Sequence, residues 1–279
     1  MIEELAPAKV NLVLHVGPRE PGGLHAVCSL MASIDLADEV TVAPVDTVAR
    51  ADRDEVACTP PIDGPNLAAA AVEALRRAGV ELPPLRVEID KRIPVAAGLG
   101  GGSADAGAAL RAANRLAGEP LGVDELRRVA APLGSDVPSQ VDPRHALVSG
   151  TGERVEPVAL PPMALLIVPA AEGLSTAAVY EEADRIGSVR EHLEPEAVRA
   201  LAGRSALEIA AGLENDLEQA ALSLRPELAD TLAAVRDSGA LRARVTGSGP
   251  TAFGVYADLA AAHAAAETLP GAILSSLRG

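Results

Sequence analysis

The hydrophobic pattern of the first ninety residues predicts strands interrupted by one helix. In residues 9–16 (KVNLVLHV), apolar and polar side chains alternate and β-branched residues are common, which is typical of a β-strand. Further extended segments are expected at residues 29–35, 38–44 and 85–90. Residues 66–78 place alanine and leucine on one face between a capping Asn66 and a terminating Gly79, which predicts a helix. The charged, proline-rich residues 50–65 are expected to form a surface loop.

The rest of the chain predicts helices together with short strands. Helices are expected at residues 103–118, 123–131 and 258–269 and, with breaks at Gly203 and Gly212, through residues 176–239. Strands are expected in pairs at residues 145–150 with 153–158 and 242–245 with 251–256, and singly at 164–168. Residues 132–145 are expected to be irregular and polar. This mixture predicts the α+β class, with mixed or antiparallel sheets and helices on one side.

A run of prolines at positions 157, 161 and 162 is the most plausible domain boundary. It divides the 279 residues into an N-terminal domain, 1–157, and a C-terminal domain, 158–279. Both are long enough to contribute to a sizeable hydrophobic core.

Composition narrows the class of protein. The chain is 48% hydrophobic and carries a net charge of −15, which argues against broad binding to nucleic acid but leaves room for a small anion in a local pocket. The longest apolar stretch, near residues 163–168, is too short to span a bilayer. The acidic N-terminus does not resemble a secretory signal, and two cysteines form neither a metal pattern nor a disulfide framework. These features predict a soluble cytoplasmic protein.

Lysine is rare in this chain. Of 24 basic residues only Lys9 and Lys91 are lysines, and a lysine retained in so arginine-rich a chain merits attention. Lys9 and Asn11 are two positions apart on a predicted strand, so both side chains point to one face. Two polar groups there indicate a wet or ligand-filled cleft, although an edge strand facing solvent would fit equally well.

The strongest local signal is the glycine-rich segment GLGGGSAD, residues 98–105, just before a predicted helix. Glycines let the backbone approach a ligand, and the unpaired N–H groups of a helix N-terminus favour a phosphate. No Gly-Lys-Ser/Thr follows, which excludes a Walker A loop. Gly98, Gly100 and Ser103 nearly match a dinucleotide fingerprint, but its parallel strand context is missing. A nucleoside triphosphate site is favoured over that alternative and over a simple turn.

Two further segments gain meaning beside this loop. The turn TGSGP, residues 246–250, would be an ordinary β-turn by itself, but next to the first loop it suggests a second wall of the same pocket. Asp136, in LGSDVPSQ, is a loop aspartate of the kind that most often caps a helix or forms a turn.

Together these segments resemble the GHMP kinase superfamily of small-molecule kinases. The resemblance rests on APAKVNLVLHV, PREPGGLH, SIDLADEV, IDKRIPVAAGLGGGSADA, LGSDVP, NDLE and VTGSGPTAF, which follow one another in order over essentially the whole chain. It is strongest to the branch that uses ATP to phosphorylate a hydroxyl of a cytidine-diphosphate-bearing alcohol in non-mevalonate isoprenoid biosynthesis. It implies a two-domain α+β fold with the active site in the cleft between the domains.

The resemblance also implies roles for individual residues. Lys9 and Asp136 would be catalytic, with Asp136 accepting the hydroxyl proton and Lys9 keeping it ionised. The ATP phosphates would be held by Pro94, Val95, Ala96, Ala97, Gly98, Leu99, Gly100, Gly101, Gly102, Ser103 and Ala104. Asn66 would lie near the adenine. Mg²⁺ would bridge the phosphates; Ser103 or Asp105 could touch it, and no metal site made of protein alone is expected.

On the substrate side, the resemblance places Asn11, His25 and Tyr180, with His25 reading the cytosine edge and Tyr180 stacking on the base. The second glycine turn would add Gly247, Ser248 and Gly249. The chain departs from the family at Leu24, which replaces an aromatic residue, and at residues 139–144. Tyr180 is then the only ring available for stacking, because Phe253 and Tyr256 fall in a predicted core strand, so weaker cytidine binding is expected.

Two alternatives remain at this point. Another GHMP kinase, acting on homoserine or a mevalonate-type alcohol, would carry similar motifs. A catalytically silent nucleotide-binding paralogue is the second. We expect no nucleic-acid or membrane partner, and a monomer or weak homodimer.

Overall fold

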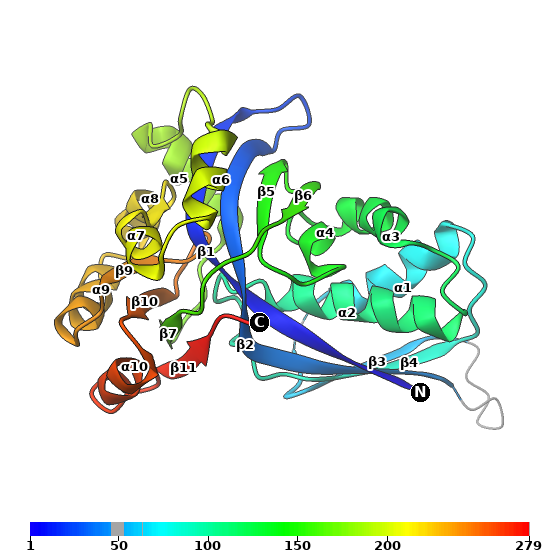
Figure 1. The fold of residues 1–279 in the computed structure, drawn as a ribbon. Coiled ribbons are helices and arrows are strands. Elements are labelled where there is room, and N and C mark those ends of the chain that lie inside the picture. The colour runs from blue at the N-terminus through cyan, green and yellow to red at the C-terminus, as the bar shows by residue number, and fades with distance from the viewer. Residues whose placement is uncertain (46–52, 63, 279) are drawn as a thin grey trace. The chain divides into compact units, whose positions relative to one another are not determined.

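The computed structural model describes residues 1–45, 53–62 and 64–278, and it contains two compact units (Figure 1). Unit 1 comprises Met1–Ala8, Leu36–Ile93 and Gly100–Pro143. Unit 2 comprises Lys9–Asp35, Pro94–Leu99 and Arg144–Gly279. The long strands β1 (Ile2–Arg19) and β2 (His25–Pro44) therefore each give residues to both units. The sequence boundary between residues 157 and 158 stays a prediction.

Unit 1 builds a sheet face covered by helices. The second half of β2 pairs antiparallel with β4 (Leu85–Asp90), and β4 pairs in parallel with β3 (Glu55–Thr59). Helices α1 (Leu67–Arg77) and α2 (Gly101–Leu116) pack together above these strands, as Figure 1 shows. The short helices are α3 (Val123–Ala130), η2 (Ala131–Leu133) and α4 (Val137–Gln140).

The predicted helix after Asn66 is confirmed together with its cap. The Asn66 side-chain oxygen accepts a hydrogen bond from the backbone N–H of Ala68 at 2.8 Å, and the helix closes at Ala78, just before Gly79. The Asn66 amide also donates to the sulfur of Cys58 at 3.2 Å.

Several predictions in unit 1 were wrong. Residues 29–35 and 38–44, expected as two extended segments, belong to one unbroken strand, because β2 continues through residues 36 and 37. Part of the expected loop is strand β3, which pairs in parallel with β4. Residues 50–52 and 63 of that loop lie outside the described chain. Helix α2 begins at Gly101, not Ser103, and the strip expected to be irregular contains the buried helix α4.

Unit 2 contains two sheets. In the first, β1 lies between β2 and the two-residue strand β8 (Glu214–Asn215), and β2 also pairs with β5 (Ala146–Gly150). Strand β5 forms the predicted hairpin with β6 (Arg154–Pro157). The second sheet is wholly antiparallel, in the order β11 (Ile273–Ser276), β7 (Ala164–Val168), β10 (Ala252–Tyr256) and β9 (Arg242–Val245).

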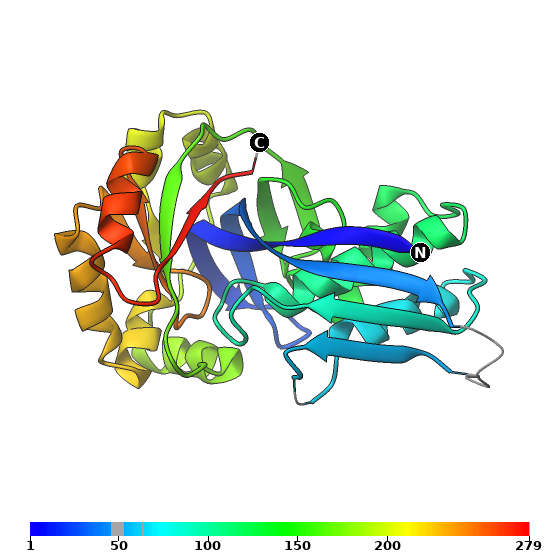
Figure 2. The same cartoon turned by 90° about the horizontal axis from the view of Figure 1, so that it is seen from below.

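Helices pack against both sheets of unit 2. Helices α9 (Leu228–Asp237) and α10 (Leu259–Ala266) cover one face of the four-stranded sheet (Figure 2). Helices α5 (Thr176–Ile186) and α8 (Glu218–Leu224) pack on β1 through a buried aliphatic cluster. The remaining helices are α6 (Pro195–Ala202) and α7 (Ala206–Ala211). The α+β class is thus confirmed, whereas β8 and β11 were not predicted.

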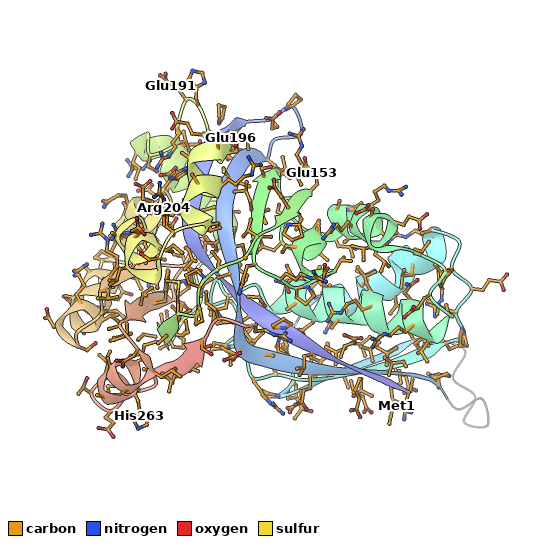
Figure 3. All side chains as sticks on the ribbon, in the orientation of Figure 1. Met1, Glu153, Glu191, Glu196, Arg204 and His263 are labelled. Carbon is orange, nitrogen blue, oxygen red and sulfur yellow. The ribbon has the colours of Figure 1, made fainter. Side chains whose placement is uncertain are left out.

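Charged side chains occupy the outside of this unit. Figure 3 shows Glu196, Arg204 and His263 projecting from the ribbon, and the His263 side chain is 69% exposed. Within the described residues, no helix combines the length and apolar character needed to cross a membrane.

Candidate active site

Lys9 and Asn11 form a buried polar pair on β1. Their exposed fractions are 4% and 3%, and Lys9 Nζ donates to Asn11 Oδ1 at 2.7 Å. The other end of the amide donates to Ser29 Oγ at 2.7 Å, and Ser29 in turn donates to the Val13 carbonyl. The prediction that the two side chains share a face is supported by their contact, and the solvent-facing edge strand is excluded because β1 is flanked on both sides. Burial of an ammonium group is costly, so it indicates a specific role.

The two glycine turns meet directly in unit 2. Gly98 has φ +76°, and a Cβ at this position would lie 2.7 Å from the Thr246 carbonyl and 2.8 Å from that of Gly249. Gly247 has φ +58°, and a Cβ there would lie 3.0 Å from the Gly98 carbonyl and 3.2 Å from Lys9 Nζ. Only glycine suits such contacts between backbones. The expected neighbourhood of the two turns is therefore observed, with the Lys9 ammonium beside them.

Asn215 holds the second glycine turn in place, a role that the sequence did not reveal. Its amide donates to the carbonyls of Val245 and Gly247 at 2.7 and 2.8 Å. Its oxygen accepts from Leu217 N at 2.9 Å, and Glu218 accepts from Val245 N. The NDLE segment could be recognised as a motif, but its task depends on a turn thirty residues later in the chain.

Thr246 joins this turn to β1. Its hydroxyl accepts a hydrogen bond from the backbone N–H of Asn11 at 3.0 Å. Ser248, on the same turn, shares a 3.0 Å hydrogen bond with Thr176 at the start of α5. The three turn residues predicted on the substrate side thus lie on a rigidly held loop.

The first glycine loop leads into a helix whose first turn is open. Lys9 N donates to the Leu99 carbonyl at 3.0 Å, which ties the loop to β1. Gly100 then adopts φ +73° as the N-cap of α2 and offers no capping side chain. The first N–H groups of α2 therefore have no side-chain partner at the cap, and together with the helix dipole they suit a phosphate.

Asp136 lies in unit 1, half-buried at the N-terminus of α4. Its side chain makes no capping hydrogen bond to that helix within the described chain, so the cap role usual for such an aspartate is not realised. Ser139 Oγ donates to the Asp136 backbone carbonyl at 2.7 Å. Helix α2 fixes α4, because Arg111 donates to the Gln140 carbonyl at 2.5 Å. The proximity of Asp136 to Lys9 stays a prediction, as does the role of Asn66 near the adenine.

His25 and Tyr180 stack on each other in unit 2. Their ring centroids are 5.4 Å apart with an interplanar angle of 30°. His25 Nδ1 lies 2.7 Å from the Gly17 carbonyl, which can only accept, so Nδ1 carries a hydrogen. Among the described residues, Nε2 is buried with no hydrogen-bond partner, although Asp184 Oδ1 lies 3.3 Å away. Nε2 therefore faces the Asp184 carboxylate.

Asp184 lies beside the His25 ring and forms an ion pair with Arg19. Neither residue was predicted to belong to the site. Two guanidinium nitrogens of Arg19 donate to Asp184 Oδ2 at 2.5 and 2.8 Å. Burial alone would raise the pKa of Asp184, but these hydrogen bonds and the neighbouring His25 lower it overall. A carboxylate kept ionised beside the imidazole helps to fix the ring.

The remaining aromatic residues lie where the sequence placed them. Phe253 and Tyr256 are buried in β10, with exposed fractions of 0% and 2%. Leu24 is 55% exposed and offers no ring. Tyr180 is therefore the one phenylalanine or tyrosine of the described residues that lies outside the core of β10.

The second lysine forms a buried cluster in unit 1. Lys91 Nζ contacts Asp105 Oδ2 at 2.7 Å and also bonds Asp38. Burial and the nearby Asp38 charge raise the pKa of Asp105 to about 7, although the Lys91 ammonium opposes this. Asp105 is thus engaged within the protein.

Comparison with known proteins decides the family. The model for the GHMP kinases N terminal domain matches residues 66–142, and that for the GHMP kinases C terminal domain matches residues 196–273. The chain is a GHMP kinase. This GHMP kinase is 43% identical over 256 residues to the 4-diphosphocytidyl-2-C-methyl-D-erythritol kinase of Streptomyces coelicolor, covering 88% of this chain and 84% of the relative. It is 44% identical over 275 residues to the kinase of the same name from Kineococcus radiotolerans, covering 95% and 83%.

Solved structures agree. A crystal structure of 4-(cytidine 5'-diphospho)-2C-methyl-D-erythritol kinase is 34% identical, with a TM-score of 0.79 and complete coverage of both chains. Homoserine kinase from Cytophaga hutchinsonii (20% identity, TM-score 0.64, 99% of this chain and 94% of that one) shares the fold alone. The family resemblance expected from the sequence is confirmed, and the chain belongs to a family of ATP-dependent small-molecule kinases.

Proposed function

We propose that this GHMP kinase transfers the γ-phosphoryl group of ATP to a hydroxyl of 4-diphosphocytidyl-2-C-methyl-D-erythritol, in non-mevalonate isoprenoid precursor biosynthesis. The relatives that carry this name match the chain over most of its length. The observation that carries the chemistry is the buried Lys9 ammonium, bonded to Asn11 beside two touching glycine turns. It supplies a fixed positive charge next to a backbone surface suited to phosphate.

Phosphoryl transfer needs alignment and compensation of charge more than covalent chemistry. The backbone of the first glycine loop and the open N-terminus of α2 would hold the triphosphate. Lys9 would offset negative charge on the transferring group, with its position set by Asn11. Asp136 would accept the proton of the substrate hydroxyl late in the step, because a carboxylate is too weak a base to remove it early.

The substrate's base would be recognised by His25 and Tyr180. The His25 ring is held by Gly17 at Nδ1 and by Asp184 beside Nε2, and in this fixed position it would read the edge of the cytosine. Tyr180 offers a face for stacking. Neither homoserine nor a mevalonate-type alcohol has a base to use this pair, so the pair favours the cytidyl substrate over those alternatives.

Mg²⁺ is proposed to enter with ATP. The described residues hold no cluster of three or more histidine, cysteine or carboxylate side chains that could cage a metal, and Asp105 is already paired with Lys91. This fits an ion whose ligands are mostly phosphate oxygens and water, as is usual for Mg²⁺ at nucleotide sites. The ion would neutralise phosphate charge. We further propose that the enzyme works in the cytoplasm, where ATP is made, as a monomer or weak homodimer.

The first test compares acceptors. The purified enzyme with ATP and Mg²⁺ should release ADP with 4-diphosphocytidyl-2-C-methyl-D-erythritol and far less with homoserine or mevalonate. Preference for either of those alcohols would identify a different kinase of the family. ATP binding without acceptor-dependent ADP release would instead indicate a silent paralogue.

Replacement of Asp136 tests the mechanism. Asp136→Asn should reduce kcat by about 10²–10⁴-fold, because the proton acceptor is lost, while ATP affinity and thermal stability stay near wild type. The matched control is Asp124→Asn on α3, whose side chain is 88% exposed and which should leave kcat unchanged. Near-normal turnover of Asp136→Asn would remove this residue from the mechanism.

A further inference from the structure

The lysine that the proposed mechanism does not use is buried between two carboxylates. The side chains of Lys91, Asp38 and Asp105 are 4%, 0% and 6% exposed. A cluster with one cation and two carboxylates is costly to bury, and Asp105 Oδ1 has no hydrogen-bond partner within the described chain. An ion pair at the protein surface would not carry this cost. The burial of these three residues therefore suggests that their position in the fold has a role.

The cluster holds the chain on both sides of the first glycine loop. Asp38 Oδ1 accepts the backbone N–H groups of Arg92 and Ile93, at 2.5 and 2.8 Å, immediately before Pro94. Asp105 lies in the second turn of α2, immediately after the loop. Lys91 joins the two carboxylates, so one ammonium group connects the entry of the loop to its exit.

Packing supports the same connection. A Cβ on Gly101, the first residue of α2, would lie 3.1 Å from Ile93 Cγ2 and 3.4 Å from Lys91 Nζ. The start of α2 therefore rests directly on the residues that lead into the loop. With both ends anchored to each other, residues 94–100 have little freedom to change their span.

We propose that Lys91, with Asp38 and Asp105, is a positioning residue that closes the base of the phosphate loop and keeps its backbone N–H groups arranged for ATP. Lys91 acts through the loop and not by touching phosphate, since two of its three N–H donors bond carboxylates and its side chain is buried. This inference rests on the proposed function of the loop. Pre-arranged donors bind a ligand without the entropic cost of ordering them.

The test removes the contact between Lys91 and Asp105 and leaves the Lys91–Asp38 ion pair, which has no net charge. Asp105→Ala keeps Lys91 bonded to Asp38 but frees α2 from Lys91. We expect its KM and Kd for ATP to rise about tenfold, with kcat and the KM for the alcohol changing less than about threefold, because the loop must now be ordered by the ligand. Amide hydrogen exchange in residues 94–100 should become faster. Asp105→Asn keeps a hydrogen-bond acceptor for Lys91, so its KM and Kd for ATP should stay near those of the wild type.

A matched control separates positioning from general loss of stability. Arg76→Met breaks the ion pair with Asp54 (2.5 Å) at the far end of α1 in the same unit. It should lower thermal stability yet leave KM for ATP unchanged. If Asp105→Ala raises KM for ATP no more than Arg76→Met does, or if exchange in the loop stays slow, the positioning role is wrong.

Two safeguards keep the outcomes distinct. Should Asp105→Ala fail to fold, the triple variant Asp38→Asn, Lys91→Met and Asp105→Leu replaces the whole cluster and leaves no buried charge without a partner. It keeps an amide oxygen for the N–H groups of Arg92 and Ile93, and it must show the same rise in KM for ATP. If the wild-type enzyme itself binds no ATP, the proposed function fails, and amide exchange in residues 94–100 of Asp105→Ala then decides by itself whether the cluster holds the loop.

Discussion

At the scale of single residues, the site depends on polar groups whose directions are fixed by their partners. The Asn11 amide accepts from Lys9 and donates to Ser29, so neither end can rotate without losing a bond. His25 is fixed in the same way by Gly17 on one ring nitrogen. Residues of this kind orient a ligand because their hydrogen bonds are settled before it arrives.

Asp105 should make the stability of the protein depend on pH. Its pKa is raised to about 7 by burial and by Asp38, with Lys91 opposing, and Cys58 is the other titratable group beside it. The folded protein therefore holds a proton that the unfolded chain releases near pH 4, so this group's contribution falls as the pH rises through 7.

We expect the free energy of unfolding to drop by on the order of 1 kcal/mol from pH 6 to pH 8 on account of Asp105. Asp105→Asn cannot ionise, so this part of the decline should vanish. Denaturant unfolding of both proteins at several pH values checks it. Equal slopes for the two proteins between pH 6 and pH 8 would contradict the assignment.

At the scale of elements, α2 follows the first glycine loop at its start and packs against α4 along its side. Gly107, in the middle of α2, makes this contact possible, because a Cβ there would lie 2.4 Å from the Gln140 carbonyl. Asp136 is the N-cap residue of helix α4. The spacing of α2 and α4 should therefore set where Asp136 stands.

Gly107→Ala tests this spacing. The added methyl group must push α4 away, so we expect a loss of about 1–3 kcal/mol in the free energy of unfolding and a clear fall in kcat. Gly203→Ala is the control, because its Cβ would come no closer than 3.9 Å to another group and both stability and kcat should change little. Thermal unfolding and steady-state kinetics measure the two effects. A stable, fully active Gly107→Ala enzyme would show that α4 tolerates displacement.

Elements also show what could be predicted from sequence and why. The cap at Asn66, the hairpin of β5 and β6 and the strands around the second glycine turn follow from local rules, and all are found. Strand β8 has two residues and exists only because β1 lies beside it, some 200 positions away in the chain, so no local pattern could announce it. The cluster of Lys91, Asp38 and Asp105 was not predicted for the same reason, since only folding brings its three members together.

The candidate site residues were also only partly predictable from the sequence. Lys9 and Asn11 could be paired from their spacing on one strand, and the two glycine turns from their likeness. The partners that hold them, Ser29 and Asn215, carry no local signal.

At the scale of the whole molecule, the two units are interleaved along the chain. Unit 2 takes residues 9–35 as well as residues 144–279, and Leu14 and Val16 pack there against Val179, Ala183, Leu217 and Ala220. A cut at the sequence boundary would expose this apolar cluster on one fragment and its partners on the other.

We therefore expect residues 1–157, expressed alone, to show no cooperative thermal transition, because β1 loses β8 and the helices that cover it. Circular dichroism against temperature measures this. Co-expression with residues 158–279 should restore a cooperative transition and is the control. A cooperatively folding 1–157 fragment would instead support an autonomous N-terminal domain.

The scarcity of aromatic residues has a practical consequence for spectroscopy. The chain has no tryptophan and two tyrosines, and Tyr256 is sealed in β10 with its hydroxyl 2.7 Å from that of Ser238. Tyr180, stacked on His25, is the half-buried emitter. Quenching of the native ultraviolet fluorescence on adding a cytidine nucleotide would thus come largely from one ring, so the enzyme carries its own optical reporter and needs no attached dye.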